Sequence, residues 1–457
     1  MNQDLRSFVQ KFEEAYPGEM IRVSNAVDLD YDIMALVLEF ERRKQYPILF
    51  FDNVRDHTIP IICNVLAGRR SQALALGVQV NELAEEYSSR LKRYRDPRVI
   101  EAPPFHQVIL KDENANLGLL PIPKYFPGDA GPYITGGLMV AKHPDTGVET
   151  EGFHRLQVKG PRKMGCSLHS RRRMFHYQRL YEERGENMPA AICLGLHPAV
   201  LMGALSYPPP EVSKFQVCGG VFGEPMEVAR CSTLDLHVPA WSEIVIEGEF
   251  LAGVHEPEGP FGEFTEYFSA RSTENVYKVN CISMRKDAWF HSIASGRAGD
   301  HRTTSGLLRE AEVRNALRRT IPGVKDVHVP LSGGSALAVF ISMRQTRPGE
   351  AKHAISIAMG VDHYLKFVVV VDDDVNVFDE SDVLWAIATR VQADRDLVLI
   401  SGSLGAILDP SATEEGVTAK LGIDATKPMD DPFAERLMME PEKMAWARSV
   451  VNRLAGE

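Results

Sequence analysis

The spacing of short apolar runs changes twice along this chain, and that change limits the possible folds more than any other feature. Before about residue 100, amphipathic helical patterns alternate with a short buried-strand pattern at 47–54. Between Pro103 and about residue 305, turns rich in Gly and Pro separate short β-branched runs, which is typical of a small, largely antiparallel barrel or sandwich. After that, helix and strand patterns alternate again, and Ser381 is expected to cap the helix that follows it.

These patterns predict a multidomain protein of mixed α/β and α+β class. An N-terminal α/β unit is expected at 1–100, a central β domain at 101–305 and a C-terminal α/β domain at 306–435. A last helix, at 436–457, follows a proline-containing linker and carries an apolar stripe. Packing of this stripe on another copy of the chain and packing back on its own subunit are equally consistent with the sequence.

Charge and cysteine spacing exclude several classes of function. The net charge of −11 and the pI near 5.8 would repel nucleic acid and anionic membranes. The cysteines lack the close pairs that are typical of zinc or iron–sulfur sites, so reduced thiols are expected. The N-terminus lacks the apolar core of a signal peptide, and no apolar run reaches the roughly 20 residues that span a bilayer. The sequence therefore predicts a cytoplasmic protein.

The segment PEGPFGEFTEY, at 257–267, is the most informative one for chemistry. Its glycines and proline would shape a tight loop that presents Glu258 and Glu263. By itself, such a segment is more typical of a surface turn with solvated acids. It is accompanied, in chain order, by HRLQV at 154–158, EIVIEGEF at 243–250, VDDDVNVFDESDVLWAIATRVQADRD at 371–396, LDPSA at 408–412 and KLGIDATKP at 420–428.

With these segments in this order over nearly its whole length, the chain resembles the UbiD family of decarboxylases. The resemblance implies a reversible decarboxylase that removes CO₂ from an aromatic, heteroaromatic or α,β-unsaturated carboxylic acid through a covalent adduct with prenylated FMN. It also implies that the central domain is a flavin-binding split β-barrel that carries the catalytic residues. Arg155 would hold the substrate carboxylate, Glu258 would orient Arg155, and Glu263 would protonate the carbon that loses CO₂. The cofactor is needed because no side chain is an adequate sink for the electron pair left on carbon.

Matching to the family also implies residues that bind the cofactor and the substrate. His301 and Arg302 would bind a second polar or anionic group of the substrate, or stand in an ordinary surface loop. Phe264 and its aromatic neighbours would form an apolar wall or pack in the core. The expected partners are a small carboxylic acid, a flavin prenyltransferase that supplies the cofactor, and further copies of the chain in a dimer or hexamer. The implied cofactor-binding residues are Thr135, Thr150, Gly152, Phe153, His154, Arg155, His169, Ala204, Leu205, Ser206, Lys214 and Lys352.

The chain departs from the family at the divalent-metal site beside the flavin phosphate. The family holds the metal, commonly manganese, with an Asn, a His and a Glu. In this chain the Asn position is Thr150, the Glu position is Lys214, and the His position falls on His169 or Ser170. Exchange of a carboxylate for an ammonium group would repel a divalent cation.

Two interpretations of this departure remain open. In the first, the flavin is bound without a metal, and Lys214 neutralises the phosphate with help from Arg171, Arg172 or Arg173. In the second, the site has decayed and the chain is a non-catalytic subunit of a larger carboxylase. A separate alternative for the function is a simple flavin oxidoreductase, which would bind the flavin but would not need the loop with two acids. The intact set of one arginine and two glutamates favours the first interpretation.

Overall fold

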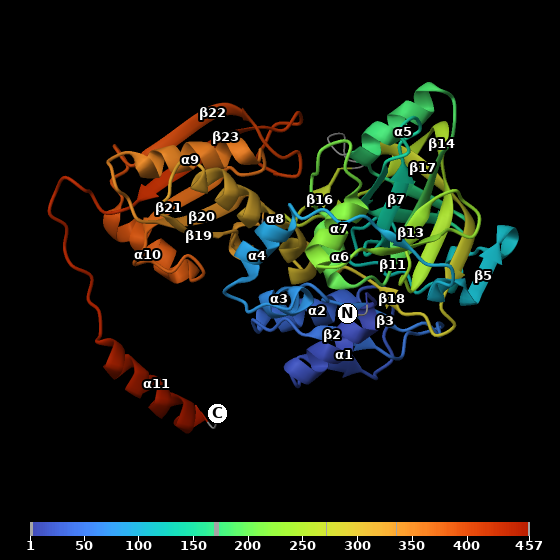
Figure 1. The fold of residues 1–457 in the computed structure, drawn as a ribbon, viewed down its shortest axis with the longest axis horizontal. Helices are drawn as coiled ribbons and strands as arrows, with labels where there is room; N and C mark the ends of the chain where they lie inside the picture. The colour runs from blue at the N-terminus through green and yellow to red at the C-terminus, as the bar shows by residue number, and fades with distance from the viewer. Residues whose placement is uncertain (1–2, 169–172, 271, 335, 456–457) are drawn as a thin grey trace.

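The computed structural model describes residues 3–168, 173–270, 272–334 and 336–455. Within these ranges the strands form five sheets, and helices pack around them (Figure 1). The protein is a mixed α/β multidomain structure, as the sequence predicts. His169, Ser170, Arg171 and Arg172 lie outside the described residues, so the structure does not address the predictions made for them.

The N-terminal sheet is completed by a strand from much later in the chain. Its elements are α1 (Leu5–Ala15), β1 (Met20–Val23), α2 (Asp32–Arg42), β2 (Ile48–Phe51), β3 (Ile61–Cys63), α3 (Arg69–Leu76), α4 (Leu83–Arg90) and the late strand β18 (Phe290–His291). The strand order is β1-β2-β3-β18. β1 is parallel to β2, β2 is antiparallel to β3, and β3 is parallel to β18. The pairing of β18 ties the central part of the chain to the N-terminal unit.

The central part is built on a nine-stranded antiparallel sheet with the order β6-β9-β10-β17-β14-β11-β7-β8, in which β5 also pairs with β17. Its elements, with the small sheets and helices around it, are β4 (Arg98–Val99), η1 (Pro104–Gln107), β5 (Val108–Lys111), η2 (Asp112–Asn114), η3 (Leu117–Leu119), β6 (Tyr133–Ile134), β7 (Leu138–Lys142), β8 (Glu149–Phe153), β9 (Leu156–Gly160), β10 (Lys163–Cys166), α5 (Arg173–Glu183), β11 (Met188–Leu194), α6 (Pro198–Ala204), α7 (Lys214–Phe222), β12 (Glu227–Arg230), β13 (His237–Pro239), β14 (Ile244–Glu258), β15 (Phe261–Gly262), β16 (Phe268–Ser269) and β17 (Ser272–Met284).

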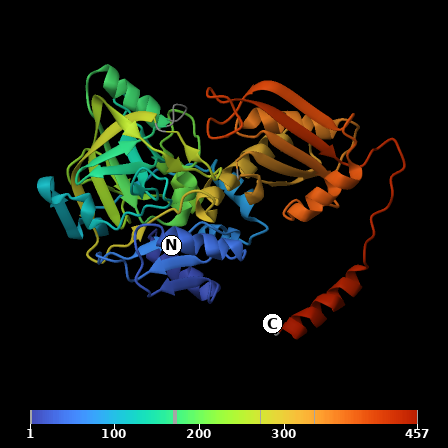
Figure 2. The same cartoon turned by 180° about the vertical axis from the view of Figure 1, so that it is seen from behind.

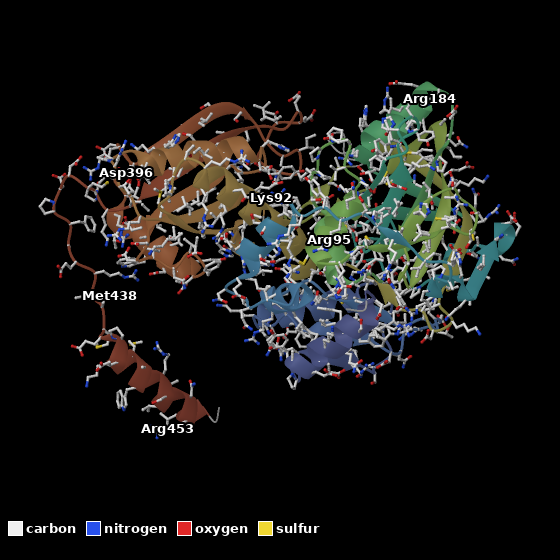
Figure 3. All side chains as sticks on the ribbon, in the orientation of Figure 1. Lys92, Arg95, Arg184, Asp396, Met438 and Arg453 are labelled. Atoms are coloured by element: carbon white, nitrogen blue, oxygen red, sulfur yellow. The ribbon has the colours of Figure 1, made fainter. Side chains whose placement is uncertain are left out.

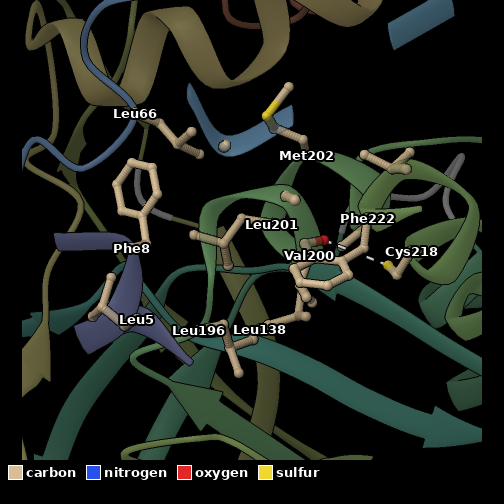
Figure 4. Close-up of a cluster of buried hydrophobic side chains, with 14 of the residues drawn as sticks. Leu5, Phe8, Leu66, Leu138, Leu196, Val200, Leu201, Met202, Cys218 and Phe222 are labelled. Atoms are coloured by element: carbon tan, nitrogen blue, oxygen red, sulfur yellow. Dashed lines mark hydrogen bonds between the residues drawn. The ribbon is translucent and has the colours of Figure 1, made fainter. Parts of the chain in front are cut away.

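Helix α1 joins the N-terminal unit to this central sheet. Asp4 caps the helix by accepting a hydrogen bond from the Ser7 backbone N–H. The apolar side chains of α1 lie on one stripe and are buried, and Figure 4 shows Leu5 and Phe8 of this stripe beside Leu201 of α6. The same cluster includes Leu138 on β7. Helices α6 and α7 are therefore held in a core that the N-terminal unit and the central sheet share.

The C-terminal part is a five-stranded sheet covered by helices, with the order β19-β20-β21-β23-β22. Strands β20, β21 and β23 are parallel, and β21 is almost wholly buried because its face on each side is covered. Asp379 caps α10, so the prediction that Ser381 is the cap is wrong; the Ser381 backbone N–H is the donor to Asp379. The elements are α8 (Gly299–Arg318), β19 (Val324–His328), η4 (Leu331–Gly333), β20 (Ala338–Met343), α9 (Glu350–Val361), β21 (Phe367–Asp372), α10 (Glu380–Arg390), β22 (Leu397–Leu404) and β23 (Val417–Ala425).

The last helix, α11 (Pro441–Ala455), lies away from the rest of the molecule in both views (Figures 1 and 2). An extended linker leads to it, and Figure 3 shows Met438 on the linker and Arg453 on the helix. Its apolar residues are exposed, with Trp446 at 65% and Leu454 at 84% of their full accessible surface. Among the described residues, no helix combines the length and the apolar character needed to cross a membrane.

Candidate active site

Arg155, Glu258 and Glu263 come together in the central part of the chain. Arg155 lies in the turn between β8 and β9, Glu258 ends β14, and Glu263 follows β15. The guanidinium donates from Nε to Oε1 of Glu258 at 3.0 Å and from Nη2 to Oε2 at 2.8 Å, which is a bidentate pair. Its Nη1 donates to Glu263. The Glu258 side chain has no exposed surface, and that of Arg155 is 16% exposed.

Backbone geometry fixes the loop that carries the two glutamates. Gly259 has a φ of +83°, a conformation that a side chain would strain. The backbone N–H of Gly262 donates to Oδ1 of Asp129 at 2.8 Å, and a Cβ at Gly262 would come within 2.7 Å of the Phe126 ring. The glycines seen in the sequence therefore serve to bring the loop close to Phe126 and Asp129, with Glu263 turned toward Arg155.

Burial and charge set the protonation of this group. Burial raises the pKa of the Glu263 carboxyl, and the positive charge of Arg155 opposes that rise. Burial alone would lower the pKa of Arg155, but the hydrogen bond to Glu258 and the charges of both glutamates raise it, so the guanidinium stays charged. The Phe261 ring lies 5.2 Å from Cζ of Arg155 and covers the pair on one side. The arrangement offers one fixed cation and one carboxyl that can hold a proton.

A cavity of about 460 Å³ is lined in part by β8, the strand that precedes Arg155. Four of the predicted cofactor-binding residues line it: Thr150, Gly152, His154 and Lys214. Such a volume is typical of a site for a cofactor or a small ligand. The other lining residues are His143, Glu151, Arg173, Met174, His176, Tyr177, Tyr207, Pro208 and Pro210.

Lys214 is the first residue of α7 and is almost wholly buried. Ser213 precedes it as the N-cap, and the Ser213 backbone N–H donates to Oε1 of Gln216, which completes a capping box. The Lys214 Nζ donates to the carbonyl of Ala204 at 2.7 Å, and it lies 5.9 Å from the centre of the Tyr207 ring. An ammonium group at the start of a helix suits an anion, because the helix dipole acts in the same direction. The Lys214 end of the cavity thus offers a positive charge to an anionic group.

Glu151 is a buried carboxylate in the cavity wall that the sequence analysis missed. Its Oε1 accepts a hydrogen bond from Sγ of Cys218 at 2.7 Å, and its Oε2 has no hydrogen-bond partner among the described residues. Burial raises its pKa to about 7, while the Cys218 bond and the charge of Lys214 lower it. The only signal in the sequence is one acid between Thr150 and Gly152 in a short strand, and such acids more often face solvent.

The remaining predicted residues lie in several places. The Thr135 hydroxyl is hydrogen-bonded to Tyr125 at 2.6 Å, and Ser206 donates to the Gly203 carbonyl at 2.7 Å. Phe153 stands between the lining residues Gly152 and His154 without being part of the lining, and Ala204 and Leu205 do not line the cavity either. Lys352 lies on α9, is exposed, donates to the Arg395 carbonyl and does not line the cavity.

The two predicted substrate residues have different surroundings. Nδ1 of His301 is buried without a hydrogen-bond partner in the described structure, and the ring packs edge-on against Phe264 at 6.2 Å. Arg302 donates to the Leu331 carbonyl at 2.8 Å and pairs with Glu41 at 3.5 Å. The Arg302 charge is thereby paired with a carboxylate of the N-terminal unit, in the contact between that unit and α8.

Comparisons with known proteins identify the family. Three family models match consecutive parts of the chain: the 3-octaprenyl-4-hydroxybenzoate carboxy-lyase N-terminal domain at 14–91, the Rift-related domain at 98–298 and the C-terminal domain at 302–425. The anhydromevalonate phosphate decarboxylase of Methanothermobacter thermautotrophicus is 32% identical over 431 residues, which cover 93% of this chain and 97% of that protein.

Solved structures agree. The UbiD-class enzyme HmfF from Pelotomaculum thermopropionicum, in complex with FMN, matches with a TM-score of 0.92 and 34% identity over 97% of this chain and 99% of that one. An evolved dimeric form of the same enzyme, in complex with prFMN, matches with a TM-score of 0.88 and 32% identity, covering 97% and 98%. The apo 3,4-dihydroxybenzoic acid decarboxylase from Enterobacter cloacae matches with a TM-score of 0.91 and 28% identity, covering 98% and 99%.

The protein is therefore an enzyme of the carboxy-lyase class with a flavin site. More narrowly, this chain belongs to the UbiD family.

Proposed function

We propose that this chain uses prenylated FMN to remove CO₂, reversibly, from an aromatic, heteroaromatic or α,β-unsaturated carboxylic acid. The observation that carries the proposal is the bidentate pair of Arg155 and Glu258 beside the buried carboxyl of Glu263. When bound, prenylated FMN supplies the sink for the electron pair that remains on carbon. The protein's own groups bind the carboxylate and return a proton.

Arg155 is the proposed anchor for the substrate carboxylate. Glu258 accepts from Nε and Nη2 of Arg155. The Nη1 group, which donates to Glu263, is therefore the one that can bind a substrate carboxylate in place of Glu263. A substrate carboxylate at Nη1 would displace Glu263 from the guanidinium. Because the charge of Arg155 holds the pKa of Glu263 down, this displacement raises that pKa further and favours the protonated acid. Glu263 can then donate its proton to the carbon after CO₂ has left.

We further propose that the flavin phosphate lies against Lys214 without a divalent metal, and that Thr150, Gly152 and His154 line the flavin's path toward Arg155. In this proposal the nine-stranded sheet is the split barrel that binds the flavin. The domain limits at residues 100, 305 and 435 remain part of the proposal. A cytoplasmic location remains a prediction, supported by six cysteines that are all buried and unpaired.

The site favours a substrate whose second polar group is neutral. Arg302 is engaged with Glu41 and the Leu331 carbonyl, which leaves His301 as the candidate contact. Burial lowers the pKa of His301 to about 4, and the charges of Arg302 and Arg155 act in the same direction, so the imidazole is neutral at pH 7. A neutral imidazole with a free nitrogen suits a hydroxyl group better than a second anion.

Decarboxylation tests the proposal directly. The chain, co-expressed with a flavin prenyltransferase, would be given 3,4-dihydroxybenzoic acid and its non-hydroxylated counterpart, benzoic acid. We expect release of CO₂, faster from the hydroxylated acid. The extracted cofactor should have the mass of prenylated FMN. A fully loaded protein that decarboxylates neither these acids nor unsaturated or heteroaromatic ones would overturn the proposal.

Substitution of Arg155 by lysine should reduce kcat/KM about 10- to 100-fold, because the forked guanidinium is replaced by a point charge that cannot serve Glu258 and a substrate together. The measurement is steady-state kinetics with 3,4-dihydroxybenzoic acid. Arg162→Lys, which changes an arginine with 30% of its side chain exposed, is the matched control. Near-normal kinetics of Arg155→Lys would remove Arg155 from carboxylate binding.

Self-association should depend on the terminal helix. The exposed apolar residues of α11 and those of the edge strand β22, such as Leu399 at 68% and Leu404 at 50% exposure, form two faces that a second copy could cover. We expect a chain that ends at residue 440 to have a smaller assembly mass by light scattering than the full chain. Arg453→Ala, on the same helix, is the control for a change outside the apolar stripe. An unchanged mass after truncation would exclude α11 from the interface.

A further inference from the structure

Phe264, the residue after Glu263, lies between two aromatic rings from later parts of the chain. The His301 ring, on α8, meets it edge-on at 6.2 Å, and the Tyr364 ring lies at 6.3 Å with a tilt of 37°. Both distances are within the range in which aromatic rings attract each other. Tyr364 belongs to the turn between α9 and β21, in the part of the chain that matches the C-terminal family model, whereas Phe264 belongs to the part that matches the central one.

Tyr364 is held in place by contacts with α8. Its backbone N–H donates to Oδ1 of Asp362 at 2.9 Å, and Oδ2 of the same carboxylate accepts from Nε of Arg309 at 2.7 Å. The Arg309 guanidinium also lies over the Tyr364 ring, 5.1 Å from its centre. The Arg309 and Asp362 side chains are only 13% and 15% exposed, so solvent weakens this ion pair little. The helix that carries His301 therefore also supports Tyr364.

The hydrogen bonds of the loop that bears Glu263 run within the loop and to other residues of the central part, such as Asp129. The Glu263 backbone N–H donates to the Tyr267 carbonyl at 3.0 Å, and the Glu266 N–H donates back to the Glu263 carbonyl at 3.0 Å. The pair of Glu266 and Arg297 lies on the surface, with both side chains about half exposed, and such pairs contribute little. The ring contacts of Phe264 thus tie the loop to the C-terminal part of the molecule.

We propose that Tyr364 is a positioning residue that packs on Phe264 and so keeps the loop that carries Glu263 in place and the Glu263 carboxyl away from water. This inference rests on the proposed function, because it matters for proton transfer only if Glu263 is the acid. Tyr364 acts through Phe264 and need not touch the substrate. The groups that interact with the Glu263 carboxyl are Arg155, Glu258, Ser269 and Asp129.

Hydrogen exchange tests the contact without any substrate. In the flavin-loaded enzyme, the backbone amides of residues 261–269 should exchange several-fold faster in Tyr364→Leu than in the unmodified protein. Tyr364→Phe keeps the ring and should restore the slow exchange. Asp362→Asn, which weakens the support by Arg309 and leaves the ring in place, should give a smaller increase; it also serves if Tyr364→Leu does not fold.

Phe378→Leu is the matched control. Phe378 is another aromatic residue of the C-terminal part, and it contacts Arg69 of the N-terminal unit at 5.2 Å, away from the loop. Its replacement should leave exchange of residues 261–269 unchanged. If it speeds that exchange as much as Tyr364→Leu does, the effect is general loosening between the parts and the inference is wrong.

Kinetic measurements distinguish a role of Tyr364 in positioning Glu263 from a role in the stability of the fold alone. With 3,4-dihydroxybenzoic acid, Tyr364→Leu should lower kcat about 2- to 10-fold with little change in KM, and Tyr364→Phe should recover it. Water that reaches Glu263 lowers its raised pKa, so the loss of activity on the alkaline side should move to lower pH. Unchanged exchange in both Tyr364→Leu and Asp362→Asn overturns the inference whatever the activity. Failure of the unmodified enzyme to decarboxylate any acid would count against the proposed function alone.

Discussion

Replacement of Glu263 by glutamine should reduce decarboxylation about 10²- to 10⁴-fold while the flavin stays bound. The amide has nearly the size of the carboxyl group, so the contact with Arg155 can persist, but an amide does not donate a proton as an acid does. The measurements are kcat for CO₂ release and the flavin content of the purified variant. Glu266→Gln, three residues further along the same loop and 47% exposed, is the control that should keep its activity.

The pH dependence follows from the same group. Burial raises the pKa of Glu263 above the ordinary value of 4.5. Because the acid form is the active one, activity should fall as the pH rises through that raised pKa, and this limb should be absent from the residual activity of Glu263→Gln. Near-normal turnover of Glu263→Gln, or an alkaline limb that persists in it, would assign the proton to another group.

Replacement of Lys214 by glutamate should release the flavin, with an affinity loss of at least about 100-fold. The change alters the local charge by two units, and it places a second carboxylate in the wall that already holds Glu151. At about 4 Å and an effective dielectric of roughly 20, one pair of unit charges is worth on the order of 4 kcal/mol. Lys214→Gln, which only removes the charge, should lose less. The measurement is the dissociation constant of FMN by fluorescence quenching.

Metal analysis and a Lys352 variant complete the test of how the flavin phosphate is bound. If the ammonium group replaces the metal, EDTA should neither release the flavin nor reduce activity, and manganese should be substoichiometric. One tightly bound manganese per chain would refute metal-free binding. Lys352→Glu makes the same charge change on exposed α9; if it, and not Lys214→Glu, released the flavin, the phosphate would be held by Lys352.

Features that depend on short stretches of sequence could be predicted. The loop with Glu258 and Glu263 was found because its glycines and acids are adjacent in the chain, and the structure places both acids on Arg155. The alternation of helices and strands in the last third follows from apolar spacing. The Ser381 cap was wrong by two residues, because Asp379 is an equally good acceptor and the spacing alone does not choose between them.

Features that depend on contacts between distant parts of the chain could not be predicted from the sequence. Neither interpretation of Arg302, as a substrate contact or as part of a surface loop, includes its partner Glu41, which comes from a helix of the N-terminal unit that no local pattern links to it. Glu151 is one acid in a five-residue strand, and only the packing of α7 against that strand buries it. The contact of Tyr364 with Phe264 joins residues that lie about a hundred positions apart, in parts of the chain that the sequence treats as separate domains.

The pairing of β18 with β3 means that the N-terminal sheet is not formed by the first hundred residues alone. Because Phe290 and His291 supply the outer strand of the N-terminal sheet, the first hundred residues are incomplete until nearly two thirds of the chain has been made. The central region is in effect an insertion within the N-terminal one, and the insertion's far end continues directly into Ser292, which bonds Tyr125, and into α8 with His301. The backbone therefore links the outer strand of the N-terminal sheet directly to the helix that carries His301.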